Sequence, residues 1–492
     1  MNIYTATQIR DWDKYTIEHE PISSIDLMER AAHAIADELL GQAYNGKPFF
    51  IFCGNGNNGG DGLAVARILL QLQRQVKVFI LEAEKHSPDC TINLNRLQEQ
   101  DFSVKEIDGA EEFPIIPADA VILDALFGTG LSRPLEGLAA LLLQHINLHQ
   151  GIIISIDIPC GLYCDRSSTG NPIVKADITL SFQVPKLAFL MAENAGYVGD
   201  WKILDIGLHP QYSLQTEAGY EMPGSSFIQS IIKPRQKFSH KYNYGHALLY
   251  AGSPGMYGAG ILCGKACLKT GVGLVSMMVE EKHLAIYQTS LPETICITDW
   301  NNENLFVKKT ALGIGPGWAM TDAYLHITKQ LLSHQLLPLV VDASALQLLA
   351  SEDIQQQLAP GTIITPHTGE FEKCFGKSNN DFERLEKALQ KATELNIFIV
   401  LKGAYTVIAT PEGKAYFNCT GNAGMAKGGS GDVLTGLLTG LLAQGYSPLY
   451  TCLLGVYLHG LAGDIAAETH TQYAMTAMDI VDSIGAAWKQ LS

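Results

Sequence analysis

The sequence predicts an α/β protein with two domains, each built on a parallel sheet covered by helices. With 492 residues, the chain exceeds the usual size of one domain. Short apolar runs alternate with helical patterns in both halves, which is typical of parallel strands joined by helices. A polar, turn-rich stretch at about residues 209–234 separates the halves and marks the expected domain boundary.

Four short apolar runs are the expected strands of the first half. They are residues 49–53, 76–81, 120–124 and 151–157. Residues 63–72 carry apolar side chains at helical spacing and are the expected helix after the first strand. Ligands of such sheets bind beyond the carboxyl ends of the strands, so the loops that follow these runs are the candidate site.

The second half repeats this alternation of strands and helices. Its expected strands are residues 246–250, 336–341, 362–364 and 398–401. Residues 406–410 and 414–418 flank the turn Pro411-Glu-Gly413 and predict a β-hairpin. The apolar run at residues 433–442 predicts a helix.

The composition limits the partners of this protein. A net charge of -16 and a pI of about 5.3 argue against a nucleic-acid groove, which needs a basic surface. The first residues lack a basic segment followed by an apolar one, and no apolar run reaches membrane-spanning length, so we expect a cytoplasmic protein without membrane partners. The ten cysteines form no CxxC pair, and we expect reduced thiols and no zinc site.

Three loops rich in glycine and acidic residues follow the strands of the first half. They are residues 54–62 (GNGNNGGDG), 124–133 (DALFGTGLSR) and 157–161 (DIPCG). Glycine lets the backbone approach an anion, and asparagine tolerates unusual dihedral angles while adding donors. Because the loops leave one edge of a parallel sheet, they should converge on one crevice. The alternative is that Asp124 and Asp157 only cap turns.

The first half resembles the N-terminal epimerase domain of the bifunctional NAD(P)H-hydrate repair enzymes over residues 1–215. The strings NNGGDG, DALFGTG and DIPCG occur in the family order, and residues 27–32 (LMERAA) also match. The resemblance implies a Rossmann-like three-layer domain that interconverts the R and S epimers of hydrated NADH or NADPH. The substrate-binding residues that it implies are Asn57, Asn58, Gly59, Gly60, Asp61, Gly128, Thr129, Gly130, Leu131, Ser132, Arg133 and Asp157.

The same resemblance implies a potassium site at Asn58, Asp124 and Cys160. The family has a serine where this chain has Cys160, and sulfur is a poor ligand for a hard alkali cation. We therefore expect the ion to rely on backbone carbonyl groups there, or to bind more weakly. Asp124 is the candidate for acid/base work at the epimerising carbon, and Asp157 for gripping the ligand. Lys186 could serve the phosphates or proton transfer, or be a solvated surface lysine.

Residues 421–436 (GNAGMAKGGSGDVLTG) are the most informative stretch of the chain. Five glycines and a serine precede Asp432, and the apolar helical run follows. A chain folded this way presents backbone N–H groups at the positive end of a helix, where an anion binds. A carboxylate there suits an enzyme that takes a proton from a hydroxyl group beside a bound phosphate. A plain tight turn is the alternative interpretation.

Further strand-end loops of the second half carry residues that suit a ligand. Residues 366–370 (PHTGE) place His367 between a proline and a glycine, which favours ligand contact over the usual structural role of a lone histidine. Residues 402–406 (KGAYT) place Lys402 beside a glycine, a setting that suits a nucleotide phosphate. Residues 313–317 (GIGPG) form another expected strand-end loop.

These strings resemble the ribokinase-like dehydratase of the same repair system over residues 225–492. The resemblance implies that ADP phosphorylates the C6 hydroxyl of the S-hydrate and that loss of phosphate restores the nicotinamide ring, leaving AMP. It places the hydrate at Ala259, Gly317 and His367, with Asp432 as the base. The family commonly has Asp-Ala-Asp where this chain has Asp342-Ala-Ser344. The implied nucleotide-binding residues are Lys402, Gly403, Ala404, Tyr405, Thr406, Asn422, Ala423, Gly424, Met425, Ala426, Lys427, Gly428, Gly429, Ser430 and Gly431.

The expected cofactors and partners follow from the same resemblance. ADP is the expected co-substrate, since bacterial members use it, and a magnesium ion accompanies the nucleotide. Related enzymes form tetramers or larger symmetric particles, so we expect a homo-oligomer. Two rival hypotheses remain open at this point. The second half could be a ribokinase-like kinase of another small molecule, and the first half could bind a ligand without catalysis.

Overall fold

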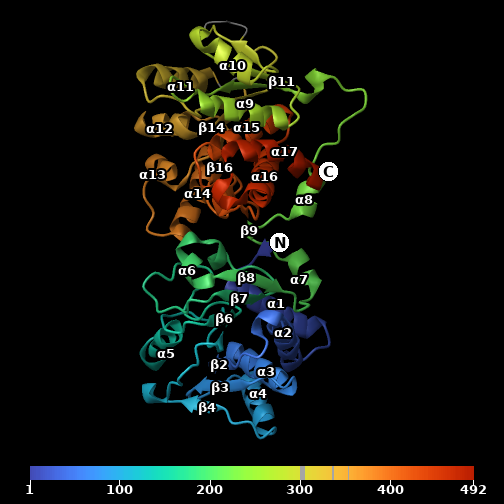
Figure 1. The fold of residues 1–492 in the computed structure, drawn as a ribbon, viewed down its shortest axis with the longest axis vertical. Helices are drawn as coiled ribbons and strands as arrows, with labels where there is room; N and C mark the ends of the chain where they lie inside the picture. Colours follow the sequence, from blue (N-terminus) through green and yellow to red (C-terminus); the bar gives the residue numbers. More distant parts are fainter. Residues whose placement is uncertain (300–304, 335–336, 353) are drawn as a thin grey trace. The chain divides into compact units, whose positions relative to one another are not determined.

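The computed structural model describes residues 1–299, 305–334, 337–352 and 354–492. They divide into two compact units, Met1–Ala218 and Gly219–Ser492 (Figure 1). The division falls inside the turn-rich stretch at residues 209–234. Each unit alternates strands and helices around a largely parallel sheet, so the α/β fold class is confirmed.

The first unit holds a sheet of parallel strands in the order β4-β3-β2-β5-β6-β7-β8. Their bounds are β2 Phe49–Cys53, β3 Val76–Leu81, β4 Lys105–Ile107, β5 Val121–Ala125, β6 Ile152–Ile156, β7 Ile178–Phe182 and β8 Asp200–Leu204. All four predicted strands are present within one residue of their predicted ends. Strand β7 was missed because Thr179 and Ser181 interrupt its apolar pattern, although both are fully buried.

Helices cover both faces of this sheet, and the side chains of β2 show how. Ile51 and Cys53 pack with helices α2 (Ser24–Leu39) and α3 (Asn57–Gln71), whereas Phe50 and Phe52 pack with helix α5 (Gly137–Asn147). Alternate residues of a strand point to opposite faces, so a strand covered on both sides is apolar throughout. The unit therefore has the predicted three layers. Its other elements are β1 Asn2–Ile3, α1 Ala6–His19, α4 Pro88–Gln98, α6 Ala195–Val198 and α7 Pro210–Gln215.

The glycine-rich stretch at residues 54–62 is partly helical rather than a loop. Helix α3 begins at Asn57, six residues before the predicted helix start. A Cβ atom on Gly59 would lie 1.9 Å from the carbonyl oxygen of Gly54, and one on Gly62 would lie 2.5 Å from the Cβ of Ala125. These glycines therefore allow the first turns of α3 to pack directly on the ends of β2 and β5.

The second unit holds a sheet with the strand order β9-β18-β17-β16-β15-β14-β13-β10-β11-β12. The bounds are β9 Tyr220–Glu221, β10 His246–Tyr250, β11 Leu274–Met278, β12 Ile295–Ile297, β13 Ala311–Ile314, β14 Leu339–Val341, β15 Ile363–Ile364, β16 Phe398–Leu401, β17 Val407–Ala409 and β18 Ala415–Phe417. The pairs β16–β17 and β17–β18 are antiparallel, which confirms the predicted hairpin. The predicted strands at 246–250 and 398–401 are confirmed, and those at 336–341 and 362–364 are shorter than predicted. Leu336 lies outside the described residues.

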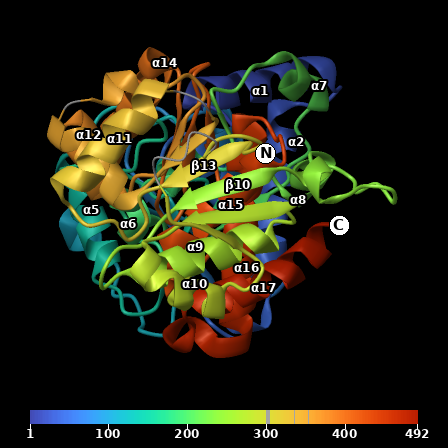
Figure 2. The same cartoon turned by 90° about the horizontal axis from the view of Figure 1, so that it is seen from above.

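Helices lie on both sides of this sheet as well. Figure 2 shows α9, α16 and α17 on one side of strands β10 and β13, with α11 and α12 on the other. The helix bounds are α8 Ser225–Ser230, α9 Tyr257–Lys269, α10 Leu284–Ser290, α11 Asp322–His334, α12 Ala343–Glu352, α13 Thr368–Phe375, α14 Asp381–Leu395, α15 Ser430–Ala443, α16 Pro448–Ala474 and α17 Ala477–Leu491.

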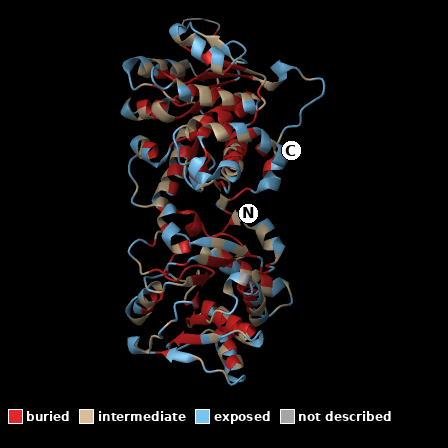
Figure 3. Ribbon diagram, in the orientation of Figure 1, coloured by how far each residue is buried: buried red, intermediate tan, exposed pale blue. Residues whose placement is uncertain are grey.

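Helix α15 contains the apolar run predicted at 433–442 and is the most enclosed helix of the second unit's core. Every residue from 433 to 443 is buried (Figure 3). Among the described helices, α16 is long and apolar enough to cross a membrane, but 67% of its most apolar window is buried inside the protein. Such burial is what the core helix of a folded domain shows.

Close packing of α15 on α9 depends on glycine. A Cβ atom on Gly436 would lie 2.2 Å from the carbonyl oxygen of Cys263. We predict that Gly436→Ala lowers the free energy of unfolding by about 1–3 kcal/mol, because the two helices must separate. Gly485→Ala in α17 is the matched control: its Cβ would meet no atom within 4 Å, and it should stabilise by about 0.5–1 kcal/mol. Urea unfolding of the full chain measures both, and equal midpoints would contradict the prediction.

Candidate active sites

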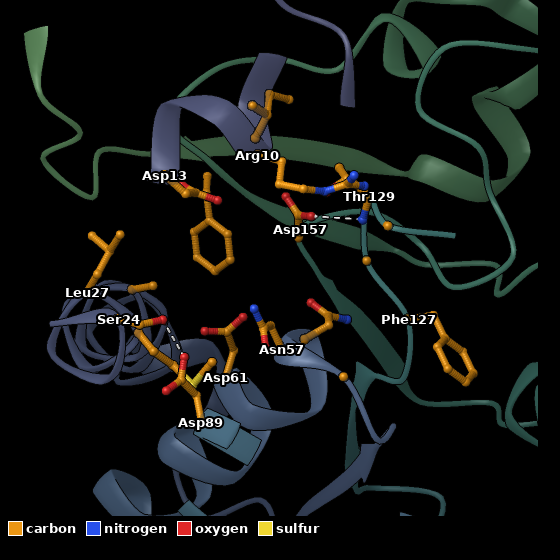
Figure 4. Close-up of a pocket in the computed structure, with 18 of the residues that line it drawn as sticks. Arg10, Asp13, Ser24, Leu27, Asn57, Asp61, Asp89, Phe127, Thr129 and Asp157 are labelled. Atoms are coloured by element: carbon orange, nitrogen blue, oxygen red, sulfur yellow. Dashed lines mark hydrogen bonds between the residues drawn. The ribbon is translucent and has the colours of Figure 1, made fainter. Parts of the chain in front are cut away.

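A cavity of about 730 Å³ opens at the carboxyl edge of the first unit's sheet (Figure 4). Its walls come from helices α1, α2 and α3, and from the chain after strands β5 and β6. The prediction that three strand-end segments converge on one crevice is therefore confirmed. The predicted substrate residues that line it are Asn57, Asn58, Asp61, Gly128, Thr129, Gly130, Leu131, Ser132, Arg133 and Asp157. Gly59 and Gly60 do not line it, because they pack against Gly54 and Met28.

Helix α1 supplies one wall of the cavity, which the sequence analysis did not predict. Ile9, Asp13 and Ile17 all line the cavity and are spaced four residues apart, so they share one face of the helix. Asp13 is thus a carboxyl group within an otherwise apolar stripe. A carboxyl group between two apolar residues on one helix face was the sequence signal for this wall, and such a signal is weak by itself.

Asp157 is held in place by a buried lysine. Its Oδ1 lies 3.0 Å from Nζ of Lys186, and its Oδ2 accepts a hydrogen bond of 3.2 Å from the backbone N–H of Thr129. Lys186 is fully buried and also donates to the carbonyl oxygens of Phe182 (2.9 Å) and Val184 (3.3 Å). The interpretation of Lys186 as a solvated surface residue is therefore wrong. Lys186 fixes the Asp157 carboxylate at the cavity wall. The backbone of Asp157 itself has a φ of 65°, in the left-handed region.

Asp124 lies beneath the cavity rather than in its wall. Its side chain is fully buried and accepts three hydrogen bonds, from Ser155 Oγ (2.8 Å), Cys160 N (2.9 Å) and Leu126 N (3.2 Å). Burial raises the pKa of Asp124 to about 6, and these three donors oppose the rise. The predicted acid/base role at the substrate carbon is at odds with this position, since three protein donors hold the carboxylate and it does not line the cavity.

The three predicted potassium ligands do not fit a potassium ion. Asp124 already accepts three hydrogen bonds from the protein, and the carbonyl oxygen of Cys160 accepts a hydrogen bond of 2.9 Å from Val174 N. Burial, together with Asp124, raises the pKa of the Cys160 thiol well above its usual range, so the sulfur stays protonated. Only Asn58 faces the cavity, and its buried Nδ2 has no hydrogen-bond partner in the described part of the chain. A protonated thiol is a poor ligand for a hard cation.

Two more carboxyl groups of the cavity have shifted pKa values. Burial and the neighbouring Asp157 raise the pKa of Asp13 to about 7, against the opposing effect of Lys186. Burial, followed by Asp157, Asp13 and Asp89, raises the pKa of Asp61 well above its usual range. Asp89 itself accepts a hydrogen bond from Ser24 Oγ (Figure 4). Groups that titrate near neutrality in a cavity are candidates for proton transfer.

In the second unit, the glycine-rich segment before α15 is anchored to α16 and the chain that follows. Gly421 N and Asn422 Nδ2 each donate a hydrogen bond of 2.9 Å to the Asp464 carboxylate. Lys427 Nζ donates to the carbonyl oxygens of Tyr473 and Met475. The predicted nucleotide residues Asn422 and Lys427 thus hold the segment in place with their side chains. Gly428 is exposed and Gly429 has φ of 99°, a backbone that favours glycine.

Asp432 lies in the first turn of α15, beside a lysine that binds another carboxylate. Lys402 Nζ lies 2.9 Å from Asp342 Oδ1, and Asp342 Oδ2 accepts a hydrogen bond of 2.7 Å from Thr435 Oγ1. Burial and the charge of Asp342 raise the pKa of Asp432 to about 6, while Lys402 opposes the rise. Asp342 is fully buried, whereas Asp432 is only half-buried. Of these two carboxyl groups, Asp432 is therefore the more accessible from outside the protein.

His367 begins helix α13 next to this cluster. Its Nδ1 accepts a hydrogen bond of 3.0 Å from Gly369 N, and its backbone pairs with that of Lys402. The imidazole is 58% exposed, and its Nε2 lies 3.4 Å from Glu370 Oε1. Glu370, which the sequence analysis gave no role, is buried with one oxygen 3.8 Å from Lys402 Nζ. The sequence signal for Glu370 was the string PHTGE, in which the histidine and the glutamate three residues later both cap the start of the helix.

The other two predicted hydrate contacts also lie together. A Cβ atom on Gly317 would lie 2.7 Å from the Cβ of Ala259, so the chain after β13 touches the first turn of α9. Ser344, where the family has an aspartate, donates a hydrogen bond of 2.8 Å to the Trp318 carbonyl oxygen in the same loop. Ser344 thus stabilises the loop through one hydrogen bond, and its hydroxyl group does not replace a carboxylate.

Comparison with known proteins identifies both units. A family model described as NAD(P)H-hydrate dehydratase matches residues 247–485, and one described as YjeF-related protein N-terminus matches residues 24–188. The bifunctional NAD(P)H-hydrate repair enzyme of Moorella thermoacetica is 36% identical over 98% of this chain and 96% of its own length. The chain belongs to the family of bifunctional NAD(P)H-hydrate repair enzymes. The relative from Escherichia coli K12 is 30% identical over 98% of this chain and 93% of its own length.

Solved structures similar to this repair enzyme cover its second unit. The Bacillus subtilis ADP/ATP-dependent NAD(P)H-hydrate dehydratase, co-crystallised with ATP and Mg²⁺, is 32% identical with a TM-score of 0.50, over 55% of this chain and 99% of its own. A ribokinase-like superfamily protein from Enterococcus faecalis V583 is 27% identical with a TM-score of 0.51, over 56% of this chain and 98% of its own. The ribokinase-like expectation for the second unit is therefore confirmed.

The buried pair of Lys186 and Asp157 leads to a stability prediction. Lys186→Met leaves the Asp157 carboxylate without its cation in a buried setting, and we expect the free energy of unfolding to fall by about 3–5 kcal/mol. The double variant that adds Asp157→Asn should recover part of this loss. Lys202→Met is the control, because the ion pair of Lys202 with Glu38 is solvent-exposed and worth about 1 kcal/mol at most. Urea unfolding in which Lys186→Met matches Lys202→Met would contradict the buried-pair interpretation.

Proposed function

We propose that residues 225–492 form an ADP-dependent dehydratase of the S epimer of hydrated NADH or NADPH, and that residues 1–215 form the epimerase that supplies this epimer. The observation that carries the proposal is the cluster of Asp432, Lys402 and Asp342 at the amide-rich start of helix α15. Such a cluster combines a base, a cation and an anion-binding helix end, which phosphoryl transfer to a hydroxyl requires.

Asp432 acts as the general base in the first step. The C6 hydroxyl of the hydrate is a weak nucleophile at neutral pH, so its proton must leave as its oxygen bonds to the β-phosphorus of ADP. AMP is then the leaving group. The phosphorylated hydrate next loses phosphate as the ring nitrogen contributes its lone pair, and loss of a proton from C5 then restores the dihydronicotinamide ring. The backbone amides at Gly428, Gly429, Ser430 and Gly431 stabilise the transferring phosphoryl group.

Lys402 places a fixed positive charge beside the proposed phosphate site. Its ammonium group is bound to the buried Asp342, which in turn accepts from Thr435, so the cation stands fixed beside the first turn of α15. A Cβ atom on Gly431 would lie 3.4 Å from Lys402 Nζ, which brings the cation close to the helix amides. A cation at that distance stabilises phosphate charge without reorganisation. His367, Ala259 and Gly317 supply the hydrate side of the site in this proposal.

The nucleotide brings magnesium with it as part of the substrate. The described residues contain no group of three histidine, cysteine, aspartate or glutamate side chains that could hold a metal. This suits an ion carried mainly by phosphate oxygens and water. Lys402, Gly403, Ala404, Tyr405 and Thr406, with residues 422–431, are the proposed nucleotide contacts. The choice of ADP over ATP follows the family resemblance alone.

In the first unit, the proposed substrate contacts are the predicted residues that line the cavity, with Asp157 as the fixed anchor. No step is assigned to potassium, since the residues expected to hold it do not fit the ion. We further propose a homo-oligomer, a tetramer or larger, in the cytoplasm, on the strength of the resemblance. Incubation with ADP and hydrated NADH, followed by the recovery of reduced-nicotinamide absorbance, tests the overall function. A protein that recovers none would overturn it.

The base assignment gives a direct mutational prediction. Asp432→Asn should retain ADP binding and lose about 10²–10⁴-fold in dehydratase turnover, the usual contribution of a general base. Steady-state rates at saturating ADP measure the loss, and calorimetry measures ADP affinity. Asp381→Asn, at the start of helix α14, is a control that removes one aspartate of the second unit outside the proposed site. A near-normal rate for Asp432→Asn would show that another group takes the proton.

The dehydratase should also have a defined pH dependence. Because Asp432 must be ionised to accept the proton, turnover should fall as the pH drops below about 6, the pKa of Asp432, and level off above it. Asp342→Asn removes a like charge and releases Lys402 toward Asp432, so the falling limb should move to lower pH. Initial rates between about pH 5 and pH 8 measure this acidic limb in the unaltered chain and in Asp342→Asn. A limb that stays in place in Asp342→Asn would contradict this electrostatic account.

A further inference from the structure

The cavity of the first unit contains four carboxyl groups that differ in their partners. Asp89 accepts from Ser24, and Asp157 is bound by Lys186 and Thr129. In the part of the chain that the structure describes, no hydrogen bond or ion pair reaches the side chains of Asp13 or Asp61. A carboxyl group that lines a cavity and has no partner within the protein is available to a ligand.

The two unpartnered groups come from different helices. Asp13 enters the cavity from α1 and Asp61 from α3, and Figure 4 shows them at different walls of the cavity. Asn58, on the same helix as Asp61, has a buried amide nitrogen without a partner among the described residues and also lines this cavity. A buried donor left unsatisfied beside two unsatisfied acceptors indicates a place built for a polar ligand.

Epimerisation of the hydrate requires a proton donor on one side of the ring and an acceptor on the other. A proton passes to the C6 hydroxyl, the C6–O bond breaks to release water, and the ring-nitrogen lone pair forms a C6=N double bond. A second water then adds to C6 from the opposite face and gives its proton to the acceptor. One water leaves and one enters, so the substrate composition is unchanged, and donor and acceptor have exchanged protonation.

We propose that Asp13 and Asp61 are this catalytic pair, one carboxyl group on each side of the bound ring, sharing a single proton. Each group is the acid for one epimer and the base for the other, as reversibility demands. The inference rests on the proposed epimerase function of the first unit. It replaces Asp124, which three protein donors hold outside the cavity, and leaves Asp157 as an anchor because Lys186 and Thr129 already hold it.

The electrostatics of the cavity support one shared proton. The pKa of Asp13 is raised to about 7, and burial with the neighbouring carboxyl groups raises the pKa of Asp61 well above its usual range. Like charges that repel one another cannot both ionise readily, and the proton therefore stays within the pair. The other titratable or charged groups that line the cavity or stand behind its wall are Arg10, Lys14, Asp89, Asp124, Arg133, Asp157 and Lys186.

The test uses the full chain with the R epimer of hydrated NADH and no ADP, and follows the appearance of the S epimer by chromatography. Asp13→Asn and Asp61→Asn should each lower the catalysed rate by about 10²–10⁴-fold, and Asp13→Glu should retain part of it. Asp11→Asn is the matched control on the same helix, because Asp11 is exposed, does not line the cavity and forms a solvent-exposed ion pair with Lys14. Thermal unfolding and ADP-dependent dehydration of the S epimer report whether each variant folds.

Two further readouts distinguish the pair from a structural role. Each inversion in oxygen-18 water should place one labelled oxygen on C6. The epimerisation rate of the unaltered chain should also rise through about pH 7 as Asp13 ionises, and this pH-dependent rise should be absent in Asp13→Asn. A folded Asp13→Asn that epimerises within twofold of the unaltered chain would overturn the pair, as would inversion without label. An unaltered chain no faster than the spontaneous exchange would overturn the epimerase function itself.

Discussion

Removal of carboxyl groups from water is the physical constraint on which both candidate sites depend. In each unit a lysine binds one carboxylate: Lys186 binds Asp157, and Lys402 binds Asp342. A neighbouring carboxyl group, Asp13 or Asp432, has no such partner among the described residues, and its pKa is raised to about 7 or 6. Burial thus separates anchoring carboxylates from groups that exchange protons near neutral pH, because only a paired charge is stable away from water.

Glycine serves packing in this chain as much as ligand approach. At the start of α3, Gly59 and Gly62 allow a helix to lie against strand ends, and Gly436 does the same between α15 and α9. The helix starts that carry Asn57, Asn58 and Asp432 are therefore held by close backbone contacts. A site whose polar residues sit on rigid helix starts needs little reorganisation when charge develops on the substrate, which is the condition for electrostatic stabilisation of a transition state.

Much of the architecture could be predicted because strands and helices leave local patterns. The run at residues 49–53 is apolar throughout because both faces of β2 are covered, and the hairpin at β17 and β18 follows from its Pro-Glu-Gly turn. Strands β7 and β8 were missed because polar side chains interrupt them. The order of the glycine and aspartate strings was sufficient to indicate the family, and the comparisons with known proteins agree.

The sequence by itself determined the fold class, the strand-end positions of the site segments and the identity of Asp432 as the carboxyl group beside a helix start. Only the tertiary structure decided that Lys186 is buried against Asp157, that Asp124 is hydrogen-bonded beneath the cavity, and that helix α1 brings Asp13 into it. The reason is physical: periodicity reports which face of an element is apolar. Burial, pairing and pKa depend instead on which groups distant in the chain lie within a few ångströms, and no local pattern encodes that distance.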